Sequence, residues 1–205
     1  MSQSQGTVVL DDIQRREGDE RLKVVAVSGS LTSPSKTTVL VESIVEALGQ
    51  RLDIDAQIIE IEKVGPQLAG SIRRTDLPSD VEGHLRAIES ADLLIAATPV
   101  YRASFTGLFK HLFDFVGQYS LVDTPVLLAA TGGSERHSLT IEHQLRPLFG
   151  FFQALTLPIG VYGSDADFTD YQVSSPSLLS RIDIAVERAV PLLGHRPVQA
   201  RPSQW

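Results

Sequence analysis

The chain has 205 residues, no cysteine, a hydrophobic fraction of 42% and a formal net charge of −7. This length suits one α/β domain with a sizeable core. The missing cysteine excludes disulfides, thiolate metal sites and cysteine nucleophiles, and the acidic balance gives no electrostatic footprint for nucleic acid or an anionic membrane. Redox chemistry would therefore need a bound cofactor, and an anionic ligand would need local positive charge.

The two ends of the chain differ in composition from the part between them. Residues 1–21 are polar and aperiodic and predict a flexible N-terminal extension; residues 22–194 predict one domain, and residues 195–205 a loose tail in which Trp205 could contact a partner subunit. No apolar run reaches the roughly 18 residues of a membrane span, and DDIQRREGDER is too acidic for a transit peptide. We therefore expect a cytoplasmic protein with no membrane partner.

Hydrophobic periodicity predicts strands and helices that alternate along the chain. Strands are expected at about 23–28, 54–61, 92–98, 124–131 and 155–162. Helices are expected at about 39–48, 81–88, 105–116, 138–152 and 177–193. Residues 62–79 contain two glycines and two prolines and predict a long loop.

This alternation predicts an α/β fold, a flavodoxin-like doubly wound sheet of five parallel strands in the order 2-1-3-4-5 with helices on both faces. In such a sheet ligands bind beyond the carboxyl ends of the strands, at the switch point between strands one and three. The loops that begin at Ser28 and at Pro99 would face each other there.

The loop after the first strand is rich in hydroxyl groups. Residues 30–38 contain six serines and threonines and one lysine, directly before a predicted helix. A helix N-terminus presents unpaired N–H groups and a partial positive charge, so this composition predicts a phosphate-binding loop. The same residue types favour helix N-caps, so a capped loop without a ligand is the alternative.

Two further loops would meet the first at this edge. Pro99 stiffens the loop after strand three, Tyr101 offers a flat face and Arg102 adds a cation, which together could hold a planar ring. Alternatively, Tyr101 packs against the next helix and Arg102 is solvated. After strand four, Gly132 and Gly133 either leave backbone N–H groups open to a ligand or only turn the chain.

Three segments, GSLTSPSKTT, ATPVYRASFTGLFKHLFD and ATGGSERH, resemble the NADPH-dependent FMN reductase family, and within it the flavin reductases of two-component alkanesulfonate or methanesulfonate monooxygenases. The resemblance implies FMN, hydride transfer from NADPH or NADH, a homodimer or homotetramer, and a partner flavin-dependent monooxygenase of sulfonate metabolism and sulfur assimilation. An FMN-retaining quinone or azo reductase is the alternative within the family. A non-enzymatic flavodoxin-like electron carrier is the alternative from another class.

The resemblance also implies which residues bind the flavin. Phosphate-contacting positions match Ser30, Ser35 and Thr37, with Lys36 and Thr38 beside them. The ribityl chain and ring match Pro99, Val100, Tyr101 and Arg102, and the pyrimidine edge matches Thr131, Gly132 and Gly133. The predicted cofactor site is completed by Ser28, Ser104 and His137.

One position departs from the family pattern. Many relatives carry an arginine where this chain has Thr32, so positive charge for the phosphate would come from Lys36 or from the helix dipole. A lysine is a point charge without the fork of an arginine. The hypothesis is that FMN is held loosely, as suits a protein that treats flavin as a substrate.

No acid–base residue is nominated as catalytic, because hydride transfer to a flavin is chemistry of the cofactor. The histidines lack metal-ligand spacing, so no metal site is predicted; His84 and His195 are expected at the surface, and His111 in solvent or at a subunit contact. The choice between NADPH and NADH stays open, because a 2′-phosphate could be bound by Arg73, Arg74 or Arg136.

Pro147 lies inside the predicted helix 138–152. It has no N–H to donate to the carbonyl of His143, so the helix must kink or form a π-bulge, a feature frequent at functional sites. In the sulfonate-linked reductases that the chain resembles, this helix carries an inserted aromatic residue in a π-helical turn at the oligomer interface, and His143 matches that position. We expect His143 and Pro147 to act in flavin transfer or oligomerisation; a merely kinked surface helix is the alternative.

Overall fold

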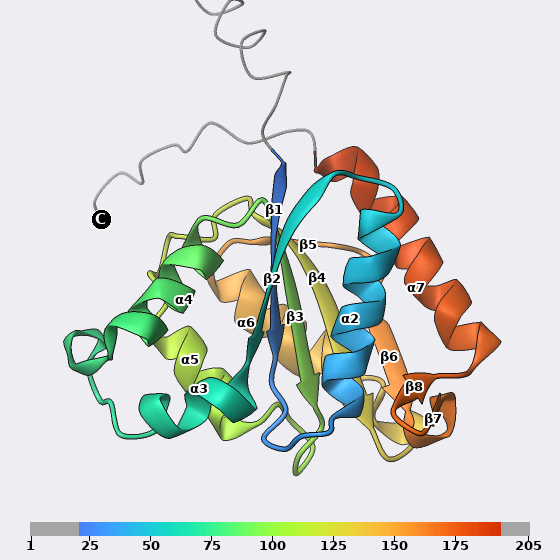
Figure 1. The fold of residues 1–205 in the computed structure, drawn as a ribbon, viewed down its shortest axis with the longest axis horizontal. Coiled ribbons are helices and arrows are strands. Elements are labelled where there is room, and N and C mark those ends of the chain that lie inside the picture. Colours follow the sequence, from blue (N-terminus) through green and yellow to red (C-terminus); the bar gives the residue numbers. More distant parts are fainter. Residues whose placement is uncertain (1–20, 194–205) are drawn as a thin grey trace, which may run out of the picture.

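The computed structural model describes residues 21–193 and contains a parallel sheet between two layers of helices (Figure 1). Its strands are β1 (Leu22–Ser28), β2 (Ile54–Glu60), β3 (Leu93–Pro99), β4 (Pro125–Gly132), β5 (Leu155–Thr156) and β6 (Val161–Ser164). The order β2-β1-β3-β4-β5, with every pair parallel, confirms the predicted topology. The predicted extension before Arg21 and the predicted tail, with His195 and Trp205, lie outside the described residues.

The fifth strand is divided, where the sequence predicted one continuous strand. β5 pairs with the start of β4 and β6 with its end, both in parallel. Between them Pro158 has no N–H to add to the ladder. Gly160 lies so close to Ile141 that a Cβ at this position would be 2.7 Å from the Ile141 Cγ2 atom. Pro158 and the tight contact between Gly160 and Ile141 therefore interrupt the strand.

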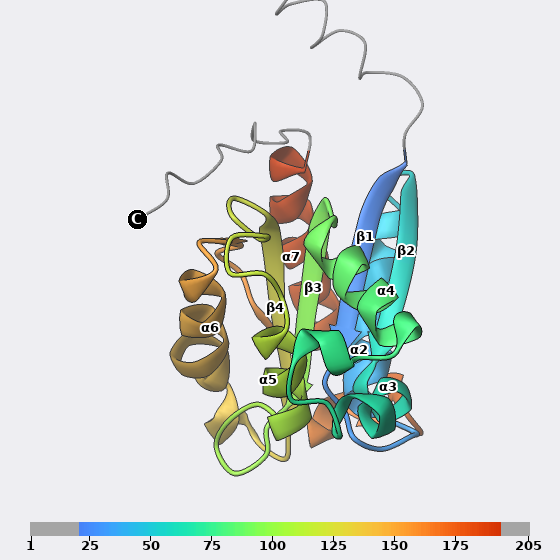
Figure 2. The ribbon, with the colours of Figure 1, turned by 90° about the vertical axis from the view of Figure 1, so that its left-hand side faces the viewer.

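Within residues 21–193, six α-helices cover the sheet. Their bounds are α2 (Lys36–Gly49), α3 (Ile61–Leu68), α4 (Ser79–Glu89), α5 (Gly107–Asp114), α6 (Arg146–Phe151) and α7 (Pro176–Ala189). Shorter elements are the 3-10 turns η1 (Arg74–Asp76), η2 (Glu135–His137), η4 (Asp165–Asp167) and η5 (Val190–Leu192), the π-helical turn η3 (Ile141–Leu145), and a hairpin of β7 (Phe168–Thr169) and β8 (Gln172–Val173). Helices α2 and α7 lie on one face of the sheet, and α3 to α6 on the other (Figures 1 and 2). Within residues 21–193, no helix has both the length and the apolar character needed to cross a membrane.

The prediction of a long loop at 62–79 was wrong at its two ends, because α3 follows β2 without a break and α4 begins at Ser79. Ile61, Val64 and Leu68 are buried along one side of α3 at helical spacing. This apolar stripe packs against the sheet, and the gain from burial outweighs the glycine and the proline inside the helix.

The core consists of two hydrophobic clusters, one on each face of the sheet. The cluster under α3 to α6 is aromatic: the ring centroids of Phe109 and Phe113 lie 4.9 Å apart, and Phe113 meets Phe149 edge to face at 5.0 Å. The cluster under α2 and α7 is mainly aliphatic, with Leu40, Ile182 and one phenylalanine, Phe168, among its buried members. Strands β1, β3 and β4 are buried on both faces, which explains their continuous apolar sequences.

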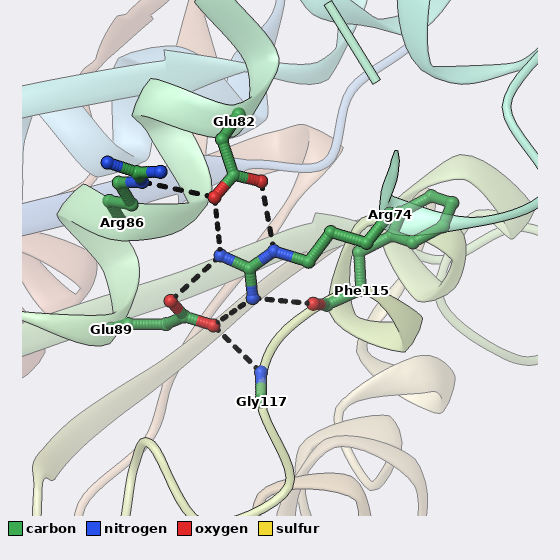
Figure 3. Close-up of polar contacts among 6 residues, drawn as sticks. All are labelled: Arg74, Glu82, Arg86, Glu89, Phe115 and Gly117. Carbon is green, nitrogen blue, oxygen red and sulfur yellow. Dashed lines mark hydrogen bonds and ion pairs between the residues drawn. The ribbon is translucent and has the colours of Figure 1, made fainter. Parts of the chain in front are cut away.

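Arg74 joins three segments on the aromatic face (Figure 3). Its guanidinium donates to both carboxylate oxygens of Glu82 at 2.9 Å, to those of Glu89 at 2.5 and 3.0 Å, and to the carbonyl of Phe115 at 3.1 Å. Glu89 in turn accepts the backbone N–H of Gly117. The network therefore fixes η1 and the turn after α5 against α4.

We expect Arg74→Met to lower the free energy of unfolding by about 2 kcal/mol at neutral pH, because two half-buried carboxylates lose their partner. Chemical denaturation measures this difference. Arg86→Met is the matched control: Arg86 also donates to Glu82, but its side chain is 76% exposed, and we expect a change below about 1 kcal/mol.

The effect of Arg74→Met should also depend on pH. Hydrogen bonds from Arg74, and then from Arg86, lower the pKa of Glu82 from 4.5 to about 2. A carboxyl group whose pKa is lower in the folded protein contributes its full stabilisation above pH 4.5, and this contribution is lost as the pH falls toward 2. The difference in the free energy of unfolding between wild type and Arg74→Met should therefore become smaller as the pH falls through that range. A difference that stays constant down to about pH 3 would contradict this account.

Candidate functional site

Three loops meet at the carboxyl edge of the sheet, after β1, β3 and β4 (Figure 1). Backbone hydrogen bonds join them: the N–H of Gly29 donates to the carbonyl of Ala97 at 2.7 Å, and the N–H of Val100 donates to that of Thr131 at 2.7 Å. The Thr106 hydroxyl donates to the carbonyl of Gly29 at 2.8 Å. The predicted convergence of the loops is therefore present, and they form one connected surface.

The first turn of the loop after β1 requires a glycine. A Cβ at Gly29 would lie 2.8 Å from the ring of Phe109 and 3.1 Å from the carbonyl of Ala97, so a side chain would push the loop away from α5. Ser30 is buried, and its hydroxyl donates to the carbonyl of Thr32 at 3.0 Å. These contacts hold the loop against the end of the sheet.

The loop ends at the N-terminus of α2, where Ser35 and Lys36 are half-buried. Ser35 is the N-cap, and its hydroxyl accepts the N–H of Thr38 at 3.3 Å. The amides of Lys36 and Thr37 occupy the first two helical positions, where no carbonyl of the same helix can accept them. Residues 31–34 are exposed. A capped helix and an anion site are thus compatible, because the cap uses a different amide.

Several of the predicted hydroxyls bond within the protein. The hydroxyls of Thr37 and Thr131 are both buried and lie 2.6 Å apart, which ties α2 to the loop after β4. The hydroxyls of Ser28 and Thr38 lie 2.8 Å apart. These four side chains hold the loops together, and their hydroxyls are already bonded within the protein.

Lys36 forms an ion pair that the sequence did not predict. Its ammonium lies 2.7 Å from a carboxylate oxygen of Asp165. Asp165 begins η4, directly after β6, so the parallel topology places it at the same edge of the sheet as the loop after β1. An acidic residue just beyond the last strand was the signal that could have identified it.

The loop after β3 forms a tight turn. Tyr101 and Ser104 exchange backbone hydrogen bonds of 2.8 and 3.1 Å, and the residues between them, Arg102 and Ala103, have φ angles of 51° and 70°. Such angles are uncommon for residues other than glycine, and the surrounding structure must hold them. Tyr101 is 45% exposed and Arg102 is exposed. The ring of Tyr101 is therefore available to a ligand at this edge.

A tyrosine that the sequence analysis did not select positions the loop after β4. The hydroxyl of Tyr162 donates to the carbonyl of Ser134 at 2.6 Å. A Cβ at Gly132 would collide with this hydroxyl, so Gly132 is required by the close approach. Burial, followed by nearby carboxylates, raises the pKa of Tyr162 to about 12. Gly133 is exposed, as is His137 at the end of η2.

The predicted distortion at Pro147 is confirmed as the π-helical turn η3. The N–H of Arg146 donates to the carbonyl of Ile141, five residues earlier. His143 lies in this turn and is exposed. The neighbouring Gln144, which the sequence analysis missed, accepts a hydrogen bond from the Ser104 hydroxyl at 3.0 Å. The π-turn therefore contacts the loop that carries Tyr101.

The predicted partners of a 2′-phosphate are not equivalent. Arg74, one of the three possible partners, is engaged by Glu82 and Glu89. Arg73 pairs with Asp76 at 3.4 Å. Arg136 is exposed in η2, beside the loop after β4.

His111 is half-buried, so of its two predicted environments the solvated one was wrong and the subunit contact stays a prediction. Its Nε2 atom lies 3.2 Å from the carbonyl oxygen of Leu68 and 3.0 Å from that of Ser71, and its ring packs edge to face on Phe115. It lines a shallow depression of about 460 Å³ to which none of the three loops contributes. His84 is half-buried beside Gln57. Over residues 21–193, no cluster of three or more His, Asp or Glu side chains could hold a metal ion.

Comparisons with known proteins agree on one family. The family model described as NADPH-dependent FMN reductase matches residues 22–169. The NADH-dependent FMN reductase SfnE of Pseudomonas putida is 58% identical over 173 residues, covering 84% of this chain and 93% of that protein. An FMN reductase (NADPH) of Pseudomonas aeruginosa is 55% identical over 174 residues, covering 85% and 94%. The crystal structure of an oxidoreductase from Corynebacterium diphtheriae superposes with a TM-score of 0.75 at 31% identity, covering 85% and 98%.

We expect Thr37→Val to lower the free energy of unfolding by about 1–3 kcal/mol, because it leaves the buried Thr131 hydroxyl without its partner. Thr131→Val should have a similar effect. The double variant should cost less than the sum of the two single variants, because both polar groups are then gone. Denaturation of all four proteins measures the coupling; strictly additive costs would show that the hydrogen bond does not link the two loops.

Proposed function

The chain belongs to the NADPH-dependent FMN reductase family, and we propose that it hands the FMN that it reduces to a separate flavin-dependent monooxygenase acting on sulfonates. The protein is an NAD(P)H-dependent FMN oxidoreductase, as its family and its most similar relatives indicate. The sulfonate partner rests on the resemblance of the three loop segments to the reductases of such systems. The absence of cysteine suits a reducing compartment, and the proposal places the reaction in the cytoplasm.

The observation that carries the proposal is the meeting of three different binding features at one sheet edge. The N-terminus of α2 with Lys36 suits a phosphate, Tyr101 offers an exposed aromatic face, and the backbone at Gly133 is exposed. FMN has a phosphate at one end and a flat ring with carbonyl oxygens at the other. The donor set therefore fits FMN, with Lys36 and the first amides of α2 toward its phosphate.

Bound FMN supplies the hydride-accepting chemistry, while the protein supplies position, electrostatics and exclusion of water. In the proposed site, Pro99 to Arg102 border the ribityl chain and ring. The buried hydrogen bond between Thr37 and Thr131 and the bond from Tyr162 to Ser134 keep the loops in register. No side chain is required to exchange a proton.

Either nicotinamide fits this proposal. One relative is named as NADH-dependent and another as an FMN reductase (NADPH). Arg74 is occupied in its network, so Arg136 is the candidate that lies beside the proposed ring site. His137 follows it and would border the nicotinamide or the flavin.

We further propose that the π-turn and α6 contact a second copy of the chain in a homodimer or homotetramer. Leu139 and Phe151 are 60% and 61% exposed, and His143 and Pro147 are exposed between them. Helix α6 lies at the edge of its layer (Figure 2). A large apolar side chain left in water is favourable to bury against another molecule. The hydrogen bond between Ser104 and Gln144 would connect this subunit contact to the loop after β3, which carries Tyr101.

Mixing the protein with NADH or NADPH and excess free FMN under anaerobic conditions tests the activity. We expect the visible absorbance of flavin to bleach in step with nicotinamide oxidation over many turnovers. Oxidation of nicotinamide that stops after one equivalent of protein, or that turns over only with a quinone or azo dye, would favour a reductase that retains its flavin. No oxidation of either nicotinamide would indicate an electron carrier.

Deleting His143 tests the role of the π-turn. We expect the deletion to restore regular α-helical spacing, and to change both the assembly state seen by sedimentation and the rate of flavin transfer to a monooxygenase. The matched control is His143→Ala, which keeps the chain length and therefore the π-turn, and which should have the smaller effect on both. Unchanged assembly, FMN occupancy and transfer in the deletion variant would leave η3 as a kinked surface helix.

A further inference from the structure

We propose that Asp165 competes with the phosphate of FMN for Lys36 and thereby weakens flavin binding, so that the product can leave for a partner enzyme. This inference rests on the proposed function, since it concerns the same site. It assigns to a residue outside the three loops a role in setting how tightly the flavin is held.

The ion pair lies at the place where a phosphate would bind. Lys36 is the first residue of α2, and its ammonium lies 2.7 Å from the Asp165 carboxylate. Lys36 also contributes the first of the amides that lack a carbonyl partner within their own helix. An anion at that terminus would therefore seek the same ammonium that Asp165 already neutralises.

Asp165 is held in this position by its own turn. The side chain of Asp167 accepts both the amide N–H and the hydroxyl of Ser164 at 2.8 Å and closes η4. Asp165 has no part in that closure, so its carboxylate is free to reach Lys36. A Cβ placed on Gly133 would lie 3.9 Å from the Oδ2 atom of Asp165. The Asp165 carboxylate thus lies close both to Lys36, at the start of α2, and to Gly133, in the loop after β4.

Two electrostatic effects follow for FMN. A phosphate must share or displace the carboxylate partner of Lys36, and its own charge of about −1.5 to −2 is repelled by the nearby carboxylate. Like charges at short range disfavour binding, although water and salt screen exposed groups. Lys36 is the one cationic side chain in residues 29–38, so this loop offers no second cation to compensate. The arrangement therefore favours release of the flavin.

Asp165→Asn keeps the size of the side chain and removes its charge. We expect the Kd for FMN, measured by flavin fluorescence or calorimetry, to fall roughly three- to tenfold at low salt, and the gain to shrink at high salt. Riboflavin, which has the same ring without the phosphate, should bind wild type and variant equally. The matched control is Asp183→Asn, which breaks the similarly exposed ion pair of Arg51 and Asp183 and changes the net charge by the same amount. It should leave both affinities unchanged.

A second background tests whether the effect passes through Lys36. In Lys36→Gln, which should weaken FMN binding, only the direct repulsion between Asp165 and the phosphate remains, so the further change Asp165→Asn should improve the Kd by less than it does in the wild-type background. Asp165→Ser provides a second neutral variant, and thermal unfolding checks that each protein is folded.

Three results would overturn the inference: an unchanged or weaker affinity for FMN in both neutral variants, an equal gain for riboflavin, or a full gain in the Lys36→Gln background. Failure of the proposed function would look different, because wild-type protein would then neither bind FMN nor oxidise NADH or NADPH in its presence. A wild type that binds and reduces FMN, with neutral variants that bind it no better, would refute only the role of Asp165.

Discussion

The parallel pairing of β1, β3 and β4 is the constraint on which the rest of the structure depends. Strands that run the same way bring their carboxyl ends to one edge, so three loops far apart in the chain must meet there. Parallel strands also need crossover helices, and these bury both faces of the sheet. The same constraint brings Asp165, at the end of β6, beside the N-terminus of α2.

At this edge the polar groups divide into two sets. Buried hydroxyls, such as those of Thr37 and Thr131, bond to each other and hold the loops together. Groups nearer to solvent, Lys36, Tyr101 and the open amides, remain for a ligand. Because the same residue types serve in loop packing and in anion binding, the composition of this loop predicts a binding site without showing which hydroxyl would bind. The pairing of Lys36 with Asp165 places a negative charge at this edge, whereas tight binding of an anion would favour a site without one.

Strand order and the π-turn followed from local patterns: unbroken apolar runs indicated buried parallel strands, and Pro147 indicated a disturbed helix. The errors came from competing signals. Glycine and proline at 65 and 66 indicated a loop, but burial of Ile61 and Leu68 decided for a helix. The fifth strand was predicted as continuous, because the contact of Gly160 with Ile141 is made only in the folded layer.

The sequence by itself determined the family, the order of elements and the three loops of the site, because hydrophobic period, turn residues and local motifs are properties of neighbouring residues. Only the tertiary structure showed that Tyr162 bonds to the loop after β4 and that Gln144 joins the π-turn to the loop after β3. It also showed that Arg74 pairs with Glu82 and that Asp165 pairs with Lys36. The pairing of Lys36 with Asp165 joins residues 129 positions apart in the chain. Contacts of such separation exist only after the sheet has brought its loops to one edge.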